Sequence, residues 1–423
     1  MLAGVVGTGA GLAGCASAPA VGTKAKRMRI FSPSLYGARH ALLVAWRRDG
    51  APFPVEFVPG ISVSIANQPF ASGEMPPPHA DVVEVSQGGM VDLHPYLKGA
   101  NLDLGRLLPQ VVARFTAACG AVTALPVGMR EVQFYVNDSL LRKLKVGRTR
   151  PWSFSAVIAA LAAHRASTTL RAGPPLVGLG WGDLNLWGAL VLGLGGALAR
   201  NGALDFVAAA TATANLASIG TRYGWSAGPS ANAVLFDFER HGFKGSRSAS
   251  CVFAFMPPGV PAGTERPEPF PTLPRMPAVP AWHTTGLAAQ PHSHQAAALV
   301  RFMGWLYAPA QQRLLATLGL PPVLAAQALR DFWHRGQGKL PAAAARFQFR
   351  GYTDVPYQIR QALHAPGMFL SQTPASLTRI GAGANAAAAL ARWQRTLESS
   401  AAALSQPSPG CHMVHVVSGP TVK

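Results

Sequence analysis

Four aromatic residues stand where the sequence predicts loops or the ends of elements, and such positions leave a ring free to meet a ligand. They are Trp181, Tyr223, Trp225 and Trp282. Flat rings cover the apolar faces of small molecules, and nearby polar side chains can bind hydroxyl groups. The polar candidates are Gln87, Arg130, Glu131, Asp183, Asn185, Asp237 and Glu239. These residue types suit noncovalent binding of a polyhydroxyl molecule, although core packing explains any single tryptophan equally well.

Histidine and cysteine spacing gives little support for a metal site. His292 and His294 form a His-x-His pair, and His283 precedes them, but zinc needs a third or fourth ligand held close by. The pair comes just before an apolar helical pattern, so we expect it to lie exposed at that helix start. The four cysteines, Cys15, Cys119, Cys251 and Cys411, match no Cys-x-x-Cys motif. We expect no metal and no cofactor, and we expect Cys119 and Cys251 to be small buried residues.

Catalytic motifs are missing from the sequence. It contains no G-x-S-x-G nucleophile elbow and no G-x-x-x-x-G-K-[ST] phosphate loop. Only 18 acidic residues occur among 423, and none form a convincing pair for glycoside hydrolysis. We therefore expect a binding protein and not an enzyme.

The amino-terminal stretch MLAGVVGTGAGLAGC contains GAGLAG, which spells the dinucleotide-binding fingerprint. A cofactor loop would need a buried strand before it and an acidic residue about 20 positions later, yet the first acidic residue is Asp49. An uncharged apolar run of this length is typical of a secretory signal. Its end, Leu-Ala-Gly-Cys, resembles a bacterial lipobox, which implies a lipid on Cys15 and a signal and tether over 1–26. A plain secretory segment is the alternative, and the usual basic residue after Met1 is lacking.

Composition excludes some classes of protein. Lys and Arg number 37 against 18 acidic residues, which gives a net charge of +19, but the basic residues are scattered and form no nucleic-acid module. We therefore expect no nucleic-acid partner. An anionic envelope surface is one setting that suits such a charge. The longest later apolar run, over 186–199, is interrupted by glycine and predicts a buried helix.

The first part of the sequence predicts β-strands that alternate with α-helices. Strands are predicted at 28–33, 54–60 and 80–89, a helix at 35–50 lies between the first two, and another helix spans 107–118. This order indicates an α/β chain with a parallel sheet. Ligands in such sheets bind beyond the carboxyl ends of strands, which here carry Ser32 to Ser34, Gly60 to Ser64 and Ser86 to Gly89.

This order of elements, together with several segments that follow it, resembles a known family. LPVGMREVQFYVNDSLLRK (125–143), RPWSFSAVIAALAAH (150–164), GLGWGDLNLWGAL (178–190), ANAVLFDFERHGF (231–243) and HSHQAAALVRFMGWLYAPAQQRLLATLGLPPV (292–323) are similar, in order, to segments of the extracellular solute-binding proteins of ABC importers, the family 1-like cluster that binds sugars. In that family the segment at 231–243 is a strand and turn. The alanine-rich segment ANAAAALARWQRTLESSAA also fits the final helix of that family. The resemblance covers about residues 1 to 400.

The resemblance implies a two-lobed α/β fold of the type II periplasmic-binding-protein class, with a ligand cleft between the lobes. Lobe I would comprise 27–130 and 285–325, and lobe II 131–284 and 326–423. It also implies an extracytoplasmic protein that is anchored to the membrane through Cys15 and passes a sugar or another small polar solute to ABC permease subunits. The segment with Arg130 and Glu131 would be the first crossing between lobes. The alternative is an exported lipoprotein of the same fold that binds a surface polymer or partner without transport.

Two departures from the family pattern concern the solute class. Asp-Phe-Glu-Arg-His-Gly, at 237–242, stands where the family often has Gly-x-Trp. A proline-rich insertion occupies 255–280, and its prolines predict an extended surface loop. Of the remaining tryptophans, Trp46, Trp305 and Trp393 lie on apolar helix faces, which predicts core packing.

Overall fold

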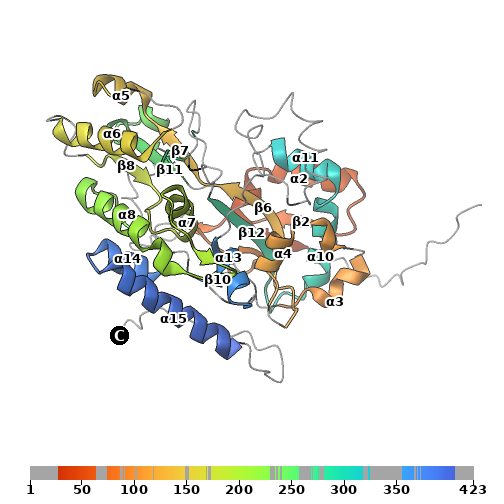
Figure 1. Cartoon of the computed structure of the whole chain (residues 1–423). Coiled ribbons are helices and arrows are strands. Elements are labelled where there is room, and N and C mark those ends of the chain that lie inside the picture. Colours follow the sequence, from red (N-terminus) through yellow and green to blue (C-terminus); the bar gives the residue numbers. More distant parts are fainter. Residues whose placement is uncertain are drawn as a thin grey trace, which may run out of the picture.

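The structure is a computed structural model of the whole chain. It describes residues 27–62, 74–85, 89, 91–100, 102–117, 119–147, 152–167, 169, 173–228, 234, 237–238, 241–256, 268, 270–274, 276, 281–317, 323, 355–365, 368, 370–371 and 373–404. Two separate hydrophobic cores are built on two sheets, which lie in different halves of the molecule with α7 and α13 between them (Figure 1).

Lobe I is the half built on a mixed five-stranded sheet of order β2-β1-β5-β12-β6. Its strands are β1 (Met28–Phe31), β2 (Val55–Phe57), β5 (Val82–Val85), β6 (Leu125–Glu131) and β12 (Trp282–Ala289). β1 is parallel to β2 and β5, as the alternation of strands and helices predicts. β12 is antiparallel to both β5 and β6, because it enters the sheet from the other lobe.

Short and long helices pack around this sheet. They are α1 (Pro33–Tyr36), α2 (Arg39–Arg48), α3 (His94–Leu97), η1 (Lys98–Ala100), η2 (Leu104–Arg106), α4 (Pro109–Arg114), α10 (Ala296–Leu306) and α11 (Pro309–Thr317). α1 begins where Ser32 Oγ accepts from the Leu35 amide, an N-cap that ends β1. The aromatic rings of Trp46 and Phe302, 5.4 Å apart, join α2 to α10. Burial of these apolar faces stabilises the lobe.

Lobe II is the half built on a three-stranded sheet of order β7-β11-β8. The strands are β7 (Gln133–Val136), β8 (Leu176–Gly178) and β11 (Phe253–Met256). β11 is antiparallel to β7 and parallel to β8. Every residue of β8 and β11 is buried, and the rings of Phe134 and Phe255 pack 4.9 Å apart at its centre.

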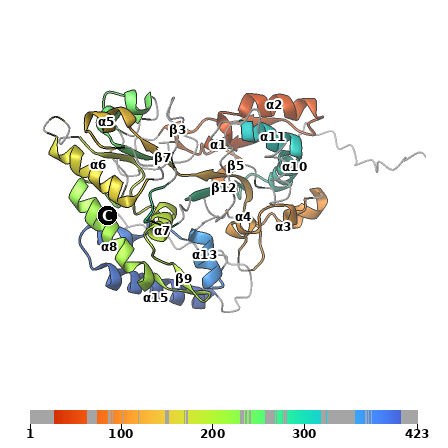
Figure 2. The same ribbon diagram turned by 45° about the horizontal axis from the view of Figure 1, so that its top comes forward.

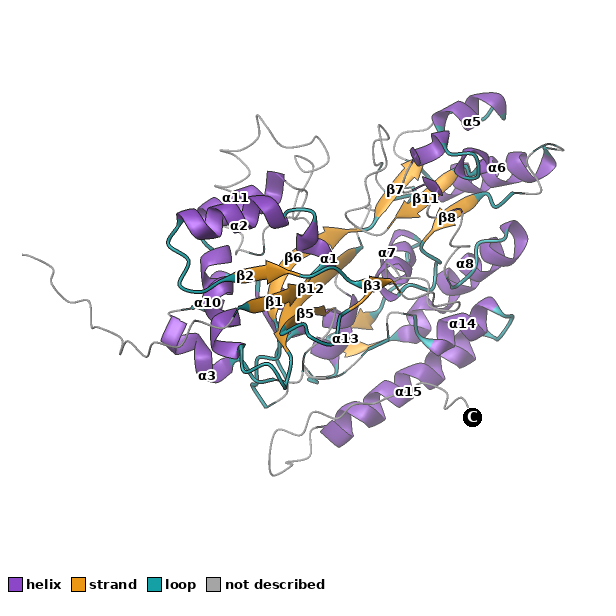
Figure 3. Ribbon diagram, turned by 180° about the vertical axis from the view of Figure 1, so that it is seen from behind, coloured by secondary structure: helices purple, strands orange, loops and turns teal. Residues whose placement is uncertain are grey.

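The helices of lobe II enclose this sheet (Figures 2 and 3). They are α5 (Asp138–Lys143), α6 (Phe154–Ala166), α7 (Leu184–Gly193), η3 (Phe206–Ala209), α8 (Ala210–Tyr223), η4 (Gly242–Lys244), η5 (Ser248–Ser250), α13 (Val355–Ala362), α14 (Ala375–Gly381) and α15 (Ala386–Leu404). Two small hairpins complete the elements, β3 (Ile61–Ser62) with β4 (Glu74–Met75) and β9 (Ala199–Arg200) with β10 (Ala203–Leu204). α7 is buried along its length, so the predicted buried helix is confirmed over 186–193.

Two of the passages between the lobes lie side by side in the described part of the chain. β6 of lobe I leads through Val132 directly into β7 of lobe II, and Ala281 immediately precedes β12. The Val132 amide donates to the Ala281 carbonyl at 2.8 Å, so the crossings are hydrogen-bonded side by side. Both residues are buried. The proposed lobe boundaries stay a prediction; β12 joins the sheet of lobe I from Trp282, three residues before the proposed boundary at 285.

Three sequence predictions need correction. At 231–243 a strand was expected, but Val234, Asp237, Phe238 and His241 are helical. In the proline-rich insertion, Phe270 and Thr272 are buried because their segment pairs with lobe II, where the Thr272 amide donates to Trp152 O. That part is therefore not a surface loop. Cys119 is exposed and disulfide-bonded, whereas Cys251 is buried and free as a thiol.

Candidate functional site

The loop 179–183, which follows β8, is held against residues 226–228. The Trp181 amide donates to Ser226 O at 3.2 Å, and the Gly182 amide donates to Ala227 O at 3.1 Å. A Cβ atom at Gly180 would lie 1.8 Å from the Gly228 carbonyl oxygen, and one at Gly182 would lie 2.5 Å from Ala227 O. The glycines therefore allow two backbone segments to touch. The space beside Gly180 and Gly182 is therefore filled by residues 226–228 and not open to a ligand.

The indoles of Trp181 and Trp225 line one cavity of about 180 Å³ on lobe II. The other lining residues come from α8, from the loop that follows α8 and from the end of α14. They are Ala217, Gly220, Thr221, Gly224, Ser226, Ala227 and Gly381. Thr221 and Ser226 are exposed, so hydroxyl groups stand at its mouth. The structure thus brings together two of the four predicted aromatics. This cavity is the first part of the candidate site.

Both indoles are held by the core of lobe II. Trp181 is 0% exposed, and Trp225 stacks on Phe255 with ring centroids 4.9 Å apart and planes 12° apart. Trp225 Nε1 donates to Leu179 O at 3.1 Å. The ring of Trp181 is fully enclosed, although the sequence places this residue in a loop. Tyr223 is also buried in this core and does not line the cavity.

Asp183 ends the same loop and lies at the boundary between the lobes. Its Oδ1 accepts from the amides of Asn185 and Leu186, so it caps the amino terminus of α7. The same oxygen lies 3.4 Å from Nε2 of His283 on β12. Both side chains are largely buried. His283, considered from the sequence only as a metal ligand, therefore forms an ion pair between the lobes when its ring is protonated.

The predicted crossing residues lie next to this pair. In the β6–β12 ladder Arg130 stands opposite His283, and Glu131 stands opposite Trp282. The ladder therefore places the backbones of these four residues beside the passage into lobe II, which is the second part of the candidate site.

Asp237 has a structural task. Its carboxylate accepts from the amides of Arg247 and Ser248, from Ser248 Oγ and from the His241 ring. Burial pushes the pKa of Asp237 upward, but these hydrogen bonds outweigh it and set the pKa below its ordinary value. Since the oxygens are engaged by the chain itself, we leave Asp237 out of the proposed site.

Arg360 on α13 makes a second contact between the lobes, one that the sequence did not reveal. Its side chain is buried, its Nε donates to Met368 O at 2.7 Å, and a terminal nitrogen donates to Arg114 O at 3.1 Å. Arg114 ends α4 of lobe I, whereas α13 packs on α7 in lobe II. α13 thus provides a contact between the halves that is separate from the crossing strands. No pattern in the sequence around Arg360 indicates this role.

The other predicted residues are spread apart. His292 and His294 lie exposed before α10, as predicted. Within the described part of the chain, no three His, Cys, Asp or Glu side chains gather as a metal site would require. In the same part, no helix has the length and apolar character needed to span a membrane. Cys15, Gln87 and Glu239 lie outside the described residues, as do the side chains of Arg130, Glu131 and Trp282.

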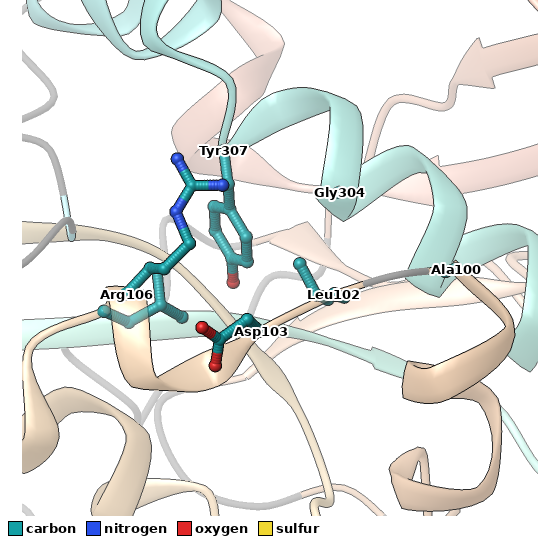
Figure 4. A pocket seen from close by; sticks show the side chains of 7 residues that line it. Ala100, Leu102, Asp103, Arg106, Gly304 and Tyr307 are labelled. Atoms are coloured by element: carbon teal, nitrogen blue, oxygen red, sulfur yellow. The ribbon is translucent and has the colours of Figure 1, made fainter.

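A second cavity, of about 140 Å³, lies in lobe I between η2 and α10 (Figure 4). Two of its polar side chains, those of Tyr307 and Asp103, already have partners within the chain. The Tyr307 hydroxyl donates to Pro126 O at 2.7 Å, and Asp103 Oδ1 accepts from the Gly105 amide at 2.8 Å. Burial raises the pKa of Tyr307 well above its ordinary value, so this phenol stays neutral. We therefore do not include this cavity in the candidate site.

Comparison with known proteins finds the same architecture in solved structures. No family model matches the chain, and no curated protein matches it by sequence. UgpB from Mycobacterium tuberculosis in complex with glycerophosphocholine is similar at 17% identity and a TM-score of 0.57, over 89% of this chain and 98% of that one. Maltose-bound MalE3 from T. maritima is similar at 15% identity and a TM-score of 0.58, over 88% and 99%.

A third structure is a putative oligosaccharide periplasmic-binding protein from Synechococcus sp. MITs9220 in complex with zinc. It is similar at 18% identity and a TM-score of 0.59, over 89% of this chain and 99% of that one. Each match extends across both lobes and nearly the whole length of the solved chain. The chain therefore has the two-lobed α/β fold of the type II periplasmic binding proteins.

Proposed function

We propose that the protein is an extracytoplasmic receptor that binds a small polar solute between its lobes and delivers it to an ABC importer. The solute class that we propose is carbohydrate or a related polyhydroxyl compound. The observation that carries this proposal is the pair of adjacent crossings at Val132 and Ala281, in a fold shared with binding proteins for maltose and glycerophosphocholine. A pair of strands of this kind can bend as a hinge while each lobe keeps its own core.

The lobe contacts explain how a ligand would act on this hinge. Asp183 with His283, and Arg360 with Arg114 O, each join one lobe to the other across a single polar contact. Breaking one such contact costs little free energy compared with disrupting the hydrophobic core of either lobe. A solute that touches both lobes stabilises the closed form by its differential affinity for that form. Binding, and not covalent chemistry, would then be the activity of the protein.

The proposed binding surface combines the lobe II cavity with the β6–β12 boundary. Trp181 and Trp225 stay candidates from the sequence as lining residues of this cavity, and Thr221 and Ser226 carry hydroxyl groups at its mouth. Arg130, Glu131 and Trp282 would contribute from lobe I, and Gln87 and Tyr223 stay candidates from the sequence. Asp183 connects the two parts, since it lies two residues from Trp181 and contacts His283.

Calorimetry with a panel of solutes tests this function. The panel would include maltose, longer oligosaccharides, polyols and glycerophosphocholine, and a thermal-shift screen would identify candidates first. A solute at 100 times its dissociation constant stabilises a protein by about 2.7 kcal/mol, which such a screen detects. Absence of binding by any member of the panel, with a folded protein, would count against a sugar or polyol receptor.

A matched pair of variants on α8 tests the cavity. Ala217 lines it, whereas Ala214, three residues earlier on the same helix, is exposed. Ala217→Met would place a long side chain into the cavity and should weaken solute binding at least tenfold. Ala214→Met adds the same side chain to the helix surface and should leave affinity unchanged. Equal affinity of both variants would remove the cavity from the site without affecting the fold.

The membrane anchor is a separate part of the proposal. We propose that Cys15 carries lipid and becomes the amino terminus, because LAGC follows an apolar run. Mass spectrometry of the membrane fraction should find a lipid-modified Cys15. Recovery of an unprocessed peptide that spans Leu2 to Ala18 would contradict the anchor.

A further inference from the structure

Three helices at the outer end of lobe I carry basic residues and no acidic ones. α2, α10 and α11 lie together at that end in all three views (Figures 1, 2 and 3). Their sequences are RHALLVAWRR, AAALVRFMGWL and PAQQRLLAT, and none contains Asp or Glu. Arg47, Arg48, Arg301 and Arg313 are all exposed. We call these four side chains the arginine face.

One carboxylate joins the three helices that carry these arginines. Asp49, which follows α2, accepts at Oδ2 from Trp305 Nε1 of α10 at 3.0 Å and from Gln311 Nε2 of α11 at 2.8 Å. The three helices therefore meet at this residue. Arg301 precedes Trp305 by one helical turn, so these two residues share a face of α10. Asp49 also pairs with Arg48 at 2.9 Å, so its charge is already shared within the protein.

The arginine face lies close to the start of the described chain. The Met28 amide donates to Pro54 O at 3.0 Å, and Pro54 lies in the short link between α2 and β2. Arg27, the residue before Met28, is thus near the carboxyl end of α2. If Cys15 is lipidated as proposed above, eleven residues separate the anchor from Arg27. Such a tether reaches at most about 40 Å, so it would keep this end of lobe I near the membrane.

We propose that the arginine face binds the phosphate groups of anionic phospholipids and so orients the tethered receptor on the membrane. Guanidinium groups bind phosphate oxygens in a bidentate manner. Clusters of basic residues are attracted to anionic leaflets, and the attraction is screened by salt. The only described acidic residue where these three helices meet is Asp49, which is engaged by three partners. The proposal rests on the proposed anchor for its geometry but not on the identity of the solute.

Vesicle sedimentation tests this surface with the full chain carrying Cys15→Ser, so that no lipid anchor contributes. Vesicles would contain either equal parts of phosphatidylglycerol and phosphatidylcholine or phosphatidylcholine alone. The test variant carries Arg47→Gln, Arg48→Gln, Arg301→Gln and Arg313→Gln. The control variant carries Arg142→Gln, Arg379→Gln, Arg392→Gln and Arg395→Gln, which removes the same charge from exposed positions of lobe II. Circular dichroism would establish that both variants are folded.

The parent should bind the anionic vesicles at low salt and lose binding at high salt. The test variant should bind them at least tenfold more weakly, and the control variant less than threefold more weakly. Equal losses in both variants would overturn the proposal, because total charge would then explain binding. Equal binding of the parent to vesicles of phosphatidylcholine alone would also overturn it. So would binding of the parent to DNA that is tighter than its binding to anionic vesicles and is lost in the test variant. Calorimetry with solutes is unaffected by these outcomes, so the two proposals fail separately.

Discussion

Oδ1 of Asp183 lies 3.4 Å from Nε2 of His283, and this contact joins lobe II to lobe I beside the crossing strands. The two atoms are within ion-pair distance but are not aligned as a hydrogen bond. Asp183 is fixed by its capping of α7, and His283 is fixed by its place in β12. The contact therefore reports on the relative position of two rigid elements.

Substitution of this pair should show an energetic coupling between the two side chains. Asparagine retains the capping of α7, so Asp183→Asn with His283→Gln forms a double-mutant cycle. We expect a coupling of about 0.5 kcal/mol or more in the free energy of unfolding, because the two side chains are in contact and largely buried. The more exposed pair Asp237 and His241 serves as control, and a coupling of zero for Asp183 with His283 would refute the contact between the lobes.

Tryptophan truncation should distinguish enclosed from half-buried rings. Trp181→Ala should lower the free energy of unfolding by about 3 to 5 kcal/mol, since the ring is fully buried. Trp305 is only partly buried beside Trp46, although the sequence predicts core packing, so Trp305→Ala should cost less. Urea denaturation of both variants measures the difference. A larger loss for Trp305→Ala would show that the assignment of the cores is incorrect.

His164 should make the stability of lobe II sensitive to acid. It is buried in α6 with its Nε2 2.8 Å from Ser250 O. Burial lowers the pKa of His164, and the carbonyl contact opposes this only in part. A lowered pKa means that the folded state binds fewer protons than the unfolded state. The stabilisation is therefore complete above the pKa of an unfolded histidine, about 6.5, and is lost as the pH falls below it.

Denaturation between pH 8 and pH 5 tests this dependence. His164→Gln should flatten the decrease of unfolding free energy over that range, whereas His241→Gln, at an exposed position, should leave it unchanged. An unchanged slope in His164→Gln would mean that another group is responsible.

The Cys251 thiol should be inert in the folded protein. Burial raises its pKa to about 12, and the thiolate is the reactive form. We expect no reaction with a disulfide reagent at pH 8 until the chain is unfolded in urea, where the thiol should react fully. Rapid modification of native Cys251 would contradict its burial.

The sequence was most informative where apolar spacing determines an element. Strands β1, β2 and β5, helices α2, α4 and α10 and the buried helix α7 all fall within segments predicted from apolar spacing, and α15 matches the final helix that the resemblance implies. It was least informative where long-range contacts decide the role of a residue. The glycines around Trp181 resemble those of an open loop, and only the approach of residues 226–228 shows why they are needed. Arg360 likewise gains its meaning from Arg114, which is 246 positions away in the chain.

Small-angle X-ray scattering with a solute identified by calorimetry tests the central claim most directly. Saturating solute should decrease the radius of gyration, because the lobes would close about the strands at Val132 and Ala281. A non-binding sugar should leave the scattering unchanged. If a solute that binds tightly left the radius of gyration the same as in the free protein, delivery by hinge closure would be contradicted.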